Sequence, residues 1–161
     1  PRRPPRLQDD TLFDTPDNAL RARRAAVRLR REPDRAFLTY KGPVQPGPMK
    51  LREEQETEVT DADVLQRILQ ELGLQAWFRY QKFREEFQAP GVVVALDETP
   101  VGTYLELEGS EEGILTVADA LGCSPADFIV DSYRGLFVAF ALANKVSARD
   151  MLFDAGDATG A

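Results

Sequence analysis

The sequence contains no histidine and only one cysteine, Cys123. The lack of histidine excludes histidine general-base catalysis and the Ser–His and Cys–His nucleophilic pairs. A single cysteine excludes an intramolecular disulfide and, together with the missing histidine, the usual zinc sites. Cys123 itself is expected to be a small buried residue, and a chain without disulfides suits a reducing, cytoplasmic compartment. Any chemistry must therefore use carboxylates, Lys, Arg, hydroxyls or a hard metal ion bound through oxygen.

Positive charge is scarce in the second part of the chain. The 161 residues carry a net charge of −7: residues 1–60 hold 13 Lys and Arg against 10 Asp and Glu, whereas residues 61–161 hold 7 against 17. An acidic chain is a poor candidate for nucleic-acid binding, which depends on phosphate neutralisation. The arginines of residues 21–35 are better explained as a solvated face. No apolar run approaches transmembrane length, so neither a nucleic-acid nor a membrane partner is expected.

Hydrophobic periodicity predicts an α+β fold with a mainly antiparallel sheet. A 3.6-residue period predicts a helix with Thr60 as its N-cap, a second helix opened by Ser110, and a third that Ser124 caps and that continues to about Asn144. Alternation with period 2, bounded by Gly, Pro, Asn and Asp, predicts strands at 7–13, 26–31, 36–41, 50–59, 77–87, 92–97 and 103–108.

Charged residues line one face of nearly every predicted strand, because successive side chains point to opposite faces. For a single strand, a solvated surface explains this pattern. Across six strands the charged faces are mostly Arg, Lys, Asp and Glu, so we expect them to meet inside a curved sheet or barrel. The residues concerned are six cations and five anions: Arg28, Arg30, Lys41, Arg52, Lys82, Arg84, Glu54, Glu56, Asp97, Glu106 and Glu108.

Such a density of charge is costly unless the charges pair with each other or hold a ligand. Arg and Lys bind phosphate oxygens, and clustered carboxylates bind Mg²⁺ or Mn²⁺, which bridge to phosphates. A triphosphate with bound metal satisfies both sets of side chains. Mutual salt bridges are the competing explanation, and the composition leaves both open.

Short motifs follow one another in a fixed order along residues 7–143: Asp-Thr-Pro at 14–16, Val-Arg-Leu-Arg at 27–30, Leu-Thr-Tyr-Lys-Gly-Pro at 38–43, Arg-Glu-Glu-Gln-Glu at 52–56, Lys-Phe-Arg at 82–84 and Leu-Glu-Leu-Glu-Gly at 105–109. This ordered set resembles the CYTH superfamily, the triphosphate tunnel metalloenzymes. That superfamily includes class IV adenylate cyclases, thiamine triphosphatases and inorganic triphosphatases. The turn at 97–102 and the pair Ser132-Tyr133 are most similar to the cyclase-like branch.

The resemblance implies an eight-stranded antiparallel β-barrel, the triphosphate tunnel, with helices packed outside. It also implies that cations bind the triphosphate while carboxylates hold Mg²⁺ or Mn²⁺. Lys41 is in addition the candidate catalytic residue. Carried over position by position, the phosphate-binding residues are Arg28, Arg30, Lys41, Lys82 and Arg84 with Arg52 in support, and the metal ligands are Glu106 and Glu108, with Asp97 beside them and Glu54 and Glu56 as charge balance or a second metal set.

One departure from the family concerns the start of the chain. Family members begin with a strand bearing Glu-x-Glu-x-Lys, and this motif does not occur before Leu7. We expect that strand and its following helix to be absent from this chain. Residues 1–153 would then form a single, N-terminally incomplete CYTH-like domain, followed by a flexible tail at 154–161.

The expected function is class IV adenylate cyclase-like conversion of ATP to cyclic AMP and pyrophosphate. The alternatives are an inorganic, thiamine or nucleoside triphosphatase of the same superfamily and a non-catalytic module that binds triphosphate or polyphosphate. The partner is accordingly a small molecule, namely ATP, tripolyphosphate or thiamine triphosphate. The apolar run 136–142 is expected to pack on the sheet or on a second subunit, which leaves a homodimer open.

Overall fold

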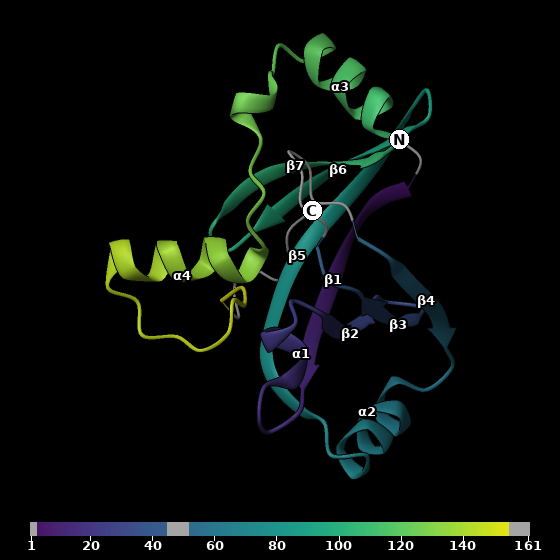
Figure 1. The fold of residues 1–161 in the computed structure, drawn as a ribbon, viewed down its shortest axis with the longest axis vertical. Helices are drawn as coiled ribbons and strands as arrows, with labels where there is room; N and C mark the ends of the chain where they lie inside the picture. Colours follow the sequence, from purple (N-terminus) through teal and green to yellow (C-terminus); the bar gives the residue numbers. More distant parts are fainter. Residues whose placement is uncertain (1–2, 45–51, 155–161) are drawn as a thin grey trace. The chain divides into compact units, whose positions relative to one another are not determined.

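A computed structural model describes residues 3–44 and 52–154 of the chain. Within these residues the fold is α+β, as the sequence predicts, with one antiparallel sheet and four helices (Figure 1). The strands are β1 (Arg3–Asp14), β2 (Ala26–Arg31), β3 (Ala36–Lys41), β4 (Glu54–Val59), β5 (Gln75–Ala89), β6 (Val92–Thr99) and β7 (Gly102–Gly109). The helices are α1 (Ala19–Ala22), α2 (Ala62–Glu71), α3 (Glu111–Ala120) and α4 (Tyr133–Asn144), with a 3₁₀ turn, η1 (Pro125–Asp127), before α4.

The sheet has seven strands in the described residues, in the order β4-β3-β2-β1-β5-β6-β7. Antiparallel registers put Arg28 opposite Thr39, and Arg84 opposite Asp97. Because side chains alternate along a strand, these registers bring the charged residues of neighbouring strands to the same face. The family resemblance implies an eight-stranded barrel, and the described residues form one seven-stranded antiparallel sheet.

The chain divides into two compact units. Among the described residues, unit 1 comprises residues 3–7, 82–146 and 153–154, and unit 2 comprises residues 8–44, 52–81 and 147–152. The strands β1 and β5 contribute residues to both units, whereas β2, β3 and β4 belong to unit 2, and β6 and β7 belong to unit 1. Each unit therefore presents its own portion of the charged face.

In unit 2, α2 covers the apolar face of the sheet. Apolar positions at helical spacing put Leu69 against Phe13 and Leu29, both fully buried, with Leu65 and Leu74 beside them. The helix begins one residue later than the sequence predicts, because the carboxylate of its N-cap, residue 61, accepts hydrogen bonds from the backbone N–H groups of residues 63 and 64. The prediction of Thr60 as the cap is wrong for this reason.

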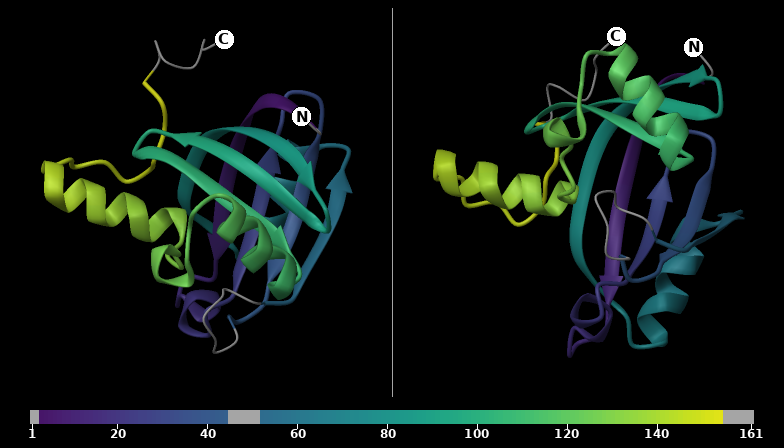
Figure 2. Two further views of the ribbon diagram at one scale, coloured as in Figure 1. Left: turned by 90° about the horizontal axis from the view of Figure 1, so that it is seen from above. Right: turned by 45° about the horizontal axis from the view of Figure 1, so that its top comes forward.

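In unit 1, α3 packs on β6 and β7 (Figure 2). Ser110 caps the helix as predicted, through a hydrogen bond from Gly113 N to Ser110 Oγ. The approach is so close that a Cβ added at Gly113 of α3 would lie 2.8 Å from Val92 Cγ2 of β6. Glycine at this position of the helix thus permits its contact with the sheet.

The last predicted helix is the main error in the secondary structure. Ser124 opens only the 3₁₀ turn η1, and the chain has no regular secondary structure until α4 begins after its own N-cap, Ser132. Cys123 is exposed rather than buried, since it follows the C-terminal end of α3. Residues 50 and 51 of the predicted strand 50–59, and residues 155–161 of the predicted tail, lie outside the described residues. No helix in residues 3–44 and 52–154 is long and apolar enough to cross a membrane.

Candidate active site

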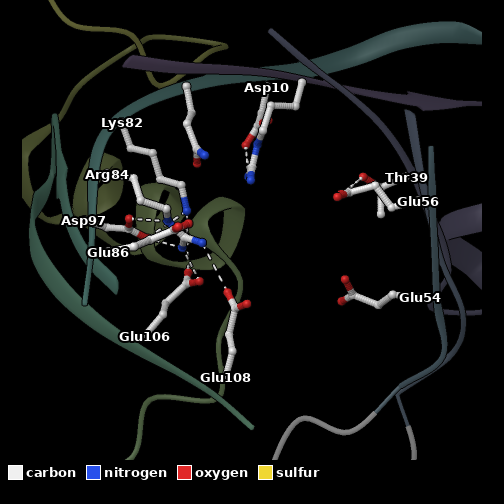
Figure 3. Close-up of polar contacts among 12 residues, drawn as sticks. Asp10, Thr39, Glu54, Glu56, Lys82, Arg84, Glu86, Asp97, Glu106 and Glu108 are labelled. Atoms are coloured by element: carbon white, nitrogen blue, oxygen red, sulfur yellow. Dashed lines mark hydrogen bonds and ion pairs between the residues drawn. The ribbon is translucent and has the colours of Figure 1, made fainter. Parts of the chain in front are cut away.

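A buried cluster of opposite charges lies on the charged face of unit 1 (Figure 3). Lys82 and Arg84 are two residues apart on β5, so both side chains point to the face on which Asp97 of β6 lies. Lys82 Nζ donates to Asp97 Oδ2 at 2.7 Å, while Arg84 Nε and Nη2 donate to Asp97 Oδ1 and Oδ2 at 2.7 and 2.6 Å. Asp97 is thus the shared anion of two cations.

Two carboxylates of β7 complete this cluster. Arg84 also donates through Nη2 to Glu106, and through Nη1 to Glu108 Oε1 at 3.1 Å. Lys82 Nζ lies 3.8 Å from Glu106 Oε1. The side chains of Glu106 and Glu108 are 36% and 57% exposed, whereas that of Asp97 is fully buried. The two glutamates therefore form the solvent-facing side of the cluster.

Charges buried in this way influence one another's ionisation. Partial burial disfavours the charged form of Glu106, but the charges of Lys82 and Arg84 outweigh it and hold the pKa of Glu106 well below its ordinary value. Burial alone would lower the pKa of Arg84, yet its hydrogen bonds to Asp97 and the charges of the glutamates raise it. The raised pKa of Arg84 and the lowered pKa of Glu106 keep these two groups charged at neutral pH, so both present fixed charges to a ligand.

A second group of charges occupies the same kind of face in unit 2. Arg30 Nε and Nη2 donate to Asp10 Oδ1 and Oδ2, each at 2.8 Å, in a fully bidentate pair. Arg28 Nη2 donates to Thr39 Oγ1 at 3.1 Å, and the Thr39 hydroxyl in turn donates to Glu56 Oε2 at 2.7 Å. Figure 3 shows Thr39 pointing to Glu56. Arg30, Arg28 and Thr39 are all buried, so their positions are fixed by these bonds.

Lys41 closes this second group beside β4. Its Nζ donates to Glu54 Oε1 at 2.7 Å, and the same oxygen accepts from Arg52 Nε at 3.3 Å. Burial and the nearby charge of Arg28 lower the pKa of Lys41 to about 8, against the opposing attraction of Glu54. Lys41 is therefore a cation that can lose its proton near neutral pH. Among the predicted site residues, Arg52 is the one that lies just before a strand rather than in it.

The structure adds four polar side chains that the sequence analysis does not assign to the site. Asp10 is fully buried against Arg30, and Tyr133 donates to Asp97. Arg6 Nη2 donates to Glu86 Oε1 at 2.7 Å on the charged face of unit 1. Gln8 and Asp10 are two residues apart on β1, and this period-2 spacing indicates that their side chains share one face. The neighbouring polar residue, Asp9, hides the alternation in the sequence. Tyr133 appears in the sequence analysis only through the family resemblance, and no strand period places it at the site, because it lies on α4.

Carboxylate oxygens are suitable ligands for a hard divalent cation, but the carboxylates of the cluster in unit 1 are not equally suited to bind one. Within residues 3–44 and 52–154, no group of three or more carboxylate or thiol side chains is arranged to hold a metal ion. Asp97 already accepts four hydrogen bonds, three of them through Oδ2, and its side chain is fully buried. Glu106 and Glu108 fit a metal ion better than Asp97 does, because their side chains are 36% and 57% exposed.

The family model described as the CYTH domain matches residues 4–123. The chain belongs to the CYTH domain family. The predicted family is thereby confirmed. A CYTH relative in Methanocaldococcus jannaschii, named "Putative adenylate cyclase", is 30% identical over 145 residues, which cover 81% of this chain and 83% of that protein.

Solved structures agree with this CYTH assignment. A protein from Pyrococcus horikoshii has a TM-score of 0.69 at 27% identity, over 84% of this chain and 85% of that one. A Hippeastrum protein, named "Putative adenylyl cyclase" and described as revealing "a dominant triphosphatase activity", has a TM-score of 0.64 at 17% identity, over 84% and 82% of the two chains. The second likeness shows the fold alone.

Proposed function

We propose that this CYTH protein is a metal-dependent enzyme that converts ATP to cyclic AMP and pyrophosphate. The observation that carries the proposal is the cluster of unit 1, in which two buried cations, Lys82 and Arg84, share one carboxylate and adjoin the two half-exposed glutamates. Cations held rigidly in this way suit phosphate oxygens. The relative from M. jannaschii, named for this activity, supports the choice of reaction.

In the proposed reaction, the ribose 3′-hydroxyl of ATP attacks the α-phosphorus. A new oxygen–phosphorus bond forms, the bond from the α-phosphorus to the bridging oxygen breaks, and pyrophosphate leaves with the electron pair. Lys82 and Arg84 would neutralise the charge that accumulates on the leaving phosphates. Mg²⁺ or Mn²⁺, held by Glu106 and Glu108, would add positive charge to the same phosphate oxygens.

The hydroxyl proton needs an acceptor, and we propose Lys41 for this role. Its pKa of about 8 leaves a substantial neutral fraction near pH 8. Arg28 and Arg30 in unit 2 are proposed as further phosphate-binding residues, with Glu54 and Glu56 balancing their charge or holding a second metal ion. Positioning and charge neutralisation, which these residues supply, are the main requirements of phosphoryl chemistry.

A triphosphatase is the second candidate, favoured by the described activity of the Hippeastrum structure. In that reaction water attacks the terminal phosphorus of tripolyphosphate, thiamine triphosphate or a nucleotide, and orthophosphate is released. Both reactions use the same cations and carboxylates. They differ in the nucleophile and therefore in their products.

Product analysis separates the candidates. The chain is incubated with ATP, tripolyphosphate or thiamine triphosphate, each with Mg²⁺ or Mn²⁺, beside the variant Arg84→Ala and the exposed control Lys145→Gln. Cyclic AMP with pyrophosphate supports the cyclase, orthophosphate supports the triphosphatase, and binding without turnover supports a binding module. The Arg84→Ala variant should lose about 100-fold or more in activity, while Lys145→Gln should keep it. The absence of both turnover and binding would overturn the proposal.

A further inference from the structure

Tyr133 is the first residue of α4 and touches the charged cluster of unit 1. Its hydroxyl donates to Asp97 Oδ2 at 2.5 Å, and its ring lies beneath Lys82, with the ammonium nitrogen 4.6 Å from the ring centroid. A cation at this distance from an aromatic face is attracted by the ring. One side chain thus contacts both the buried anion and the buried lysine.

The ring of Tyr133 is held in place by its surroundings. Ser132 caps α4 through a hydrogen bond from Gly135 N to its Oγ. The ring of Tyr104 packs edge-on against that of Tyr133, with centroids 5.9 Å apart and an angle of 76°. Tyr104 is itself the register partner of Asp97 across β6 and β7. The strand pair therefore fixes both the carboxylate and the ring that orients the tyrosine.

The hydroxyl changes how strongly Asp97 holds its cations. Asp97 Oδ2 accepts from Lys82, Arg84 and Tyr133, so the tyrosine proton takes a share of the negative charge that both cations would otherwise receive. Burial, with the nearby charges of Glu106 and Asp97, raises the pKa of Tyr133, and the hydroxyl accordingly keeps its proton. Lys82 retains the capacity to attract a second anion.

We propose that Tyr133 is a positioning residue, which holds the Lys82 ammonium between its ring and Asp97 so that it can bind a phosphate group of the substrate. The inference rests on the proposed function, since it concerns the same triphosphate. Tyr133 contacts the lysine and the carboxylate, and acts on the ligand through them. It also makes the start of α4 part of the site, although the helix follows the last strand of the sheet by more than 20 residues.

The test measures tripolyphosphate binding by titration calorimetry with Mg²⁺ present. Tyr133→Leu, which removes ring and hydroxyl, should raise the dissociation constant about 5- to 10-fold. Tyr133→Phe, which keeps the ring, should raise it about 2- to 5-fold. Leu142→Ala, an exposed change on the same helix, is the control and should bind as wild type does. Melting temperatures of all three variants accompany the titrations.

A double-mutant cycle with Lys82→Met tests whether Tyr133 affects tripolyphosphate binding through Lys82. In that background Tyr133→Leu should have no further effect on tripolyphosphate binding, because the cation that it positions is gone. Equal and independent losses in both backgrounds would overturn the inference, as would Tyr133→Leu binding like wild type or losing only thermal stability. If wild type itself binds no tripolyphosphate, the proposed function fails as well. If wild type binds and Tyr133→Leu binds equally, only the role of Tyr133 fails.

Discussion

Asp97 is the side chain on which the cluster of unit 1 depends. It is fully buried and accepts hydrogen bonds from Lys82, Arg84 and Tyr133. Removing one partner of a buried ion pair leaves an uncompensated charge, which costs more than the pair itself contributes. The residue therefore stabilises the fold as well as the site.

We predict that Asp97→Asn lowers the free energy of unfolding by roughly 3–5 kcal/mol, because Lys82 and Arg84 lose their buried counter-charge. The matched control is Glu108→Gln, which removes a carboxylate that is more than half exposed and should cost no more than about 1 kcal/mol. Urea denaturation followed by circular dichroism measures both. An equal loss of unfolding free energy in the two variants would mean that Asp97 stabilises the fold no more than Glu108 does.

The pH dependence of activity tests the role of Lys41. Burial and Arg28 lower its pKa to about 8, so the amine is mainly protonated below pH 8 and mainly neutral above it. If Lys41 accepts the hydroxyl proton, kcat/KM rises as the pH passes through about 8. If it serves only as a phosphate-binding cation, kcat/KM falls over the same range.

Glu54 supplies the control for this profile, because its charge raises the pKa of Lys41. In Glu54→Gln the midpoint should move to lower pH, by an amount that the pH profile of kcat/KM measures directly. A midpoint that stays in place would remove Lys41 as the group that titrates.

At the scale of elements, the loop from β1 to α1 is organised by Asp14. Its carboxylate accepts hydrogen bonds from the N–H groups of Thr15, Leu20 and Arg21 and from the Arg21 side chain, at 2.8 to 3.1 Å. Burial alone would raise the pKa of Asp14, but these donors outweigh it and lower the pKa. In the sequence, this Asp-Thr-Pro motif is notable only as part of the family resemblance. In the structure, its aspartate holds the loop by accepting backbone hydrogen bonds.

We predict that Asp14→Asn destabilises the protein by about 1–3 kcal/mol at pH 7. Since the folded pKa is depressed, the stability contributed by the Asp14 charge is present above the unfolded pKa and is lost as the pH falls through the folded value. The difference between wild type and variant should therefore shrink at pH 3 and below, as measured by urea midpoints. Asp17→Asn, an exposed change in the same loop, should leave the midpoint within about 0.5 kcal/mol of wild type at pH 7. A difference that is independent of pH would contradict this account.

Strand alternation predicted most of the elements and the face of each charged residue, because both depend on period 2 within one strand. Periodicity does not predict where a helix begins, because a hydrogen bond to one capping side chain decides that position. Asp61 displaced Thr60 as a cap, and Ser124 opened a single turn instead of a helix. Lys82 and Arg84 were assigned to one face correctly, whereas Asp10 and Tyr133 depend on pairings between distant segments that one strand's pattern does not contain.

At the scale of the whole molecule, ligand binding should stabilise the fold. A ligand that binds only the folded state adds about 2.7 kcal/mol at a concentration 100 times its dissociation constant. Tripolyphosphate with Mg²⁺ is therefore predicted to raise the melting temperature by several degrees, and orthophosphate at the same ionic strength to raise it much less. Calorimetry of wild type and Arg84→Ala checks this, since the variant should lose most of the gain. An equal shift in both proteins would point to a general effect of anions.

The exposed position of Cys123 has a practical consequence. It is the only thiol of the chain and lies in unit 1, while Trp77, the only tryptophan, lies in unit 2. A maleimide dye that accepts energy from tryptophan would attach at one defined place without any engineered residue. The efficiency of energy transfer would then report the distance between Trp77 and the dye on Cys123 during substrate titration, in the unaltered sequence.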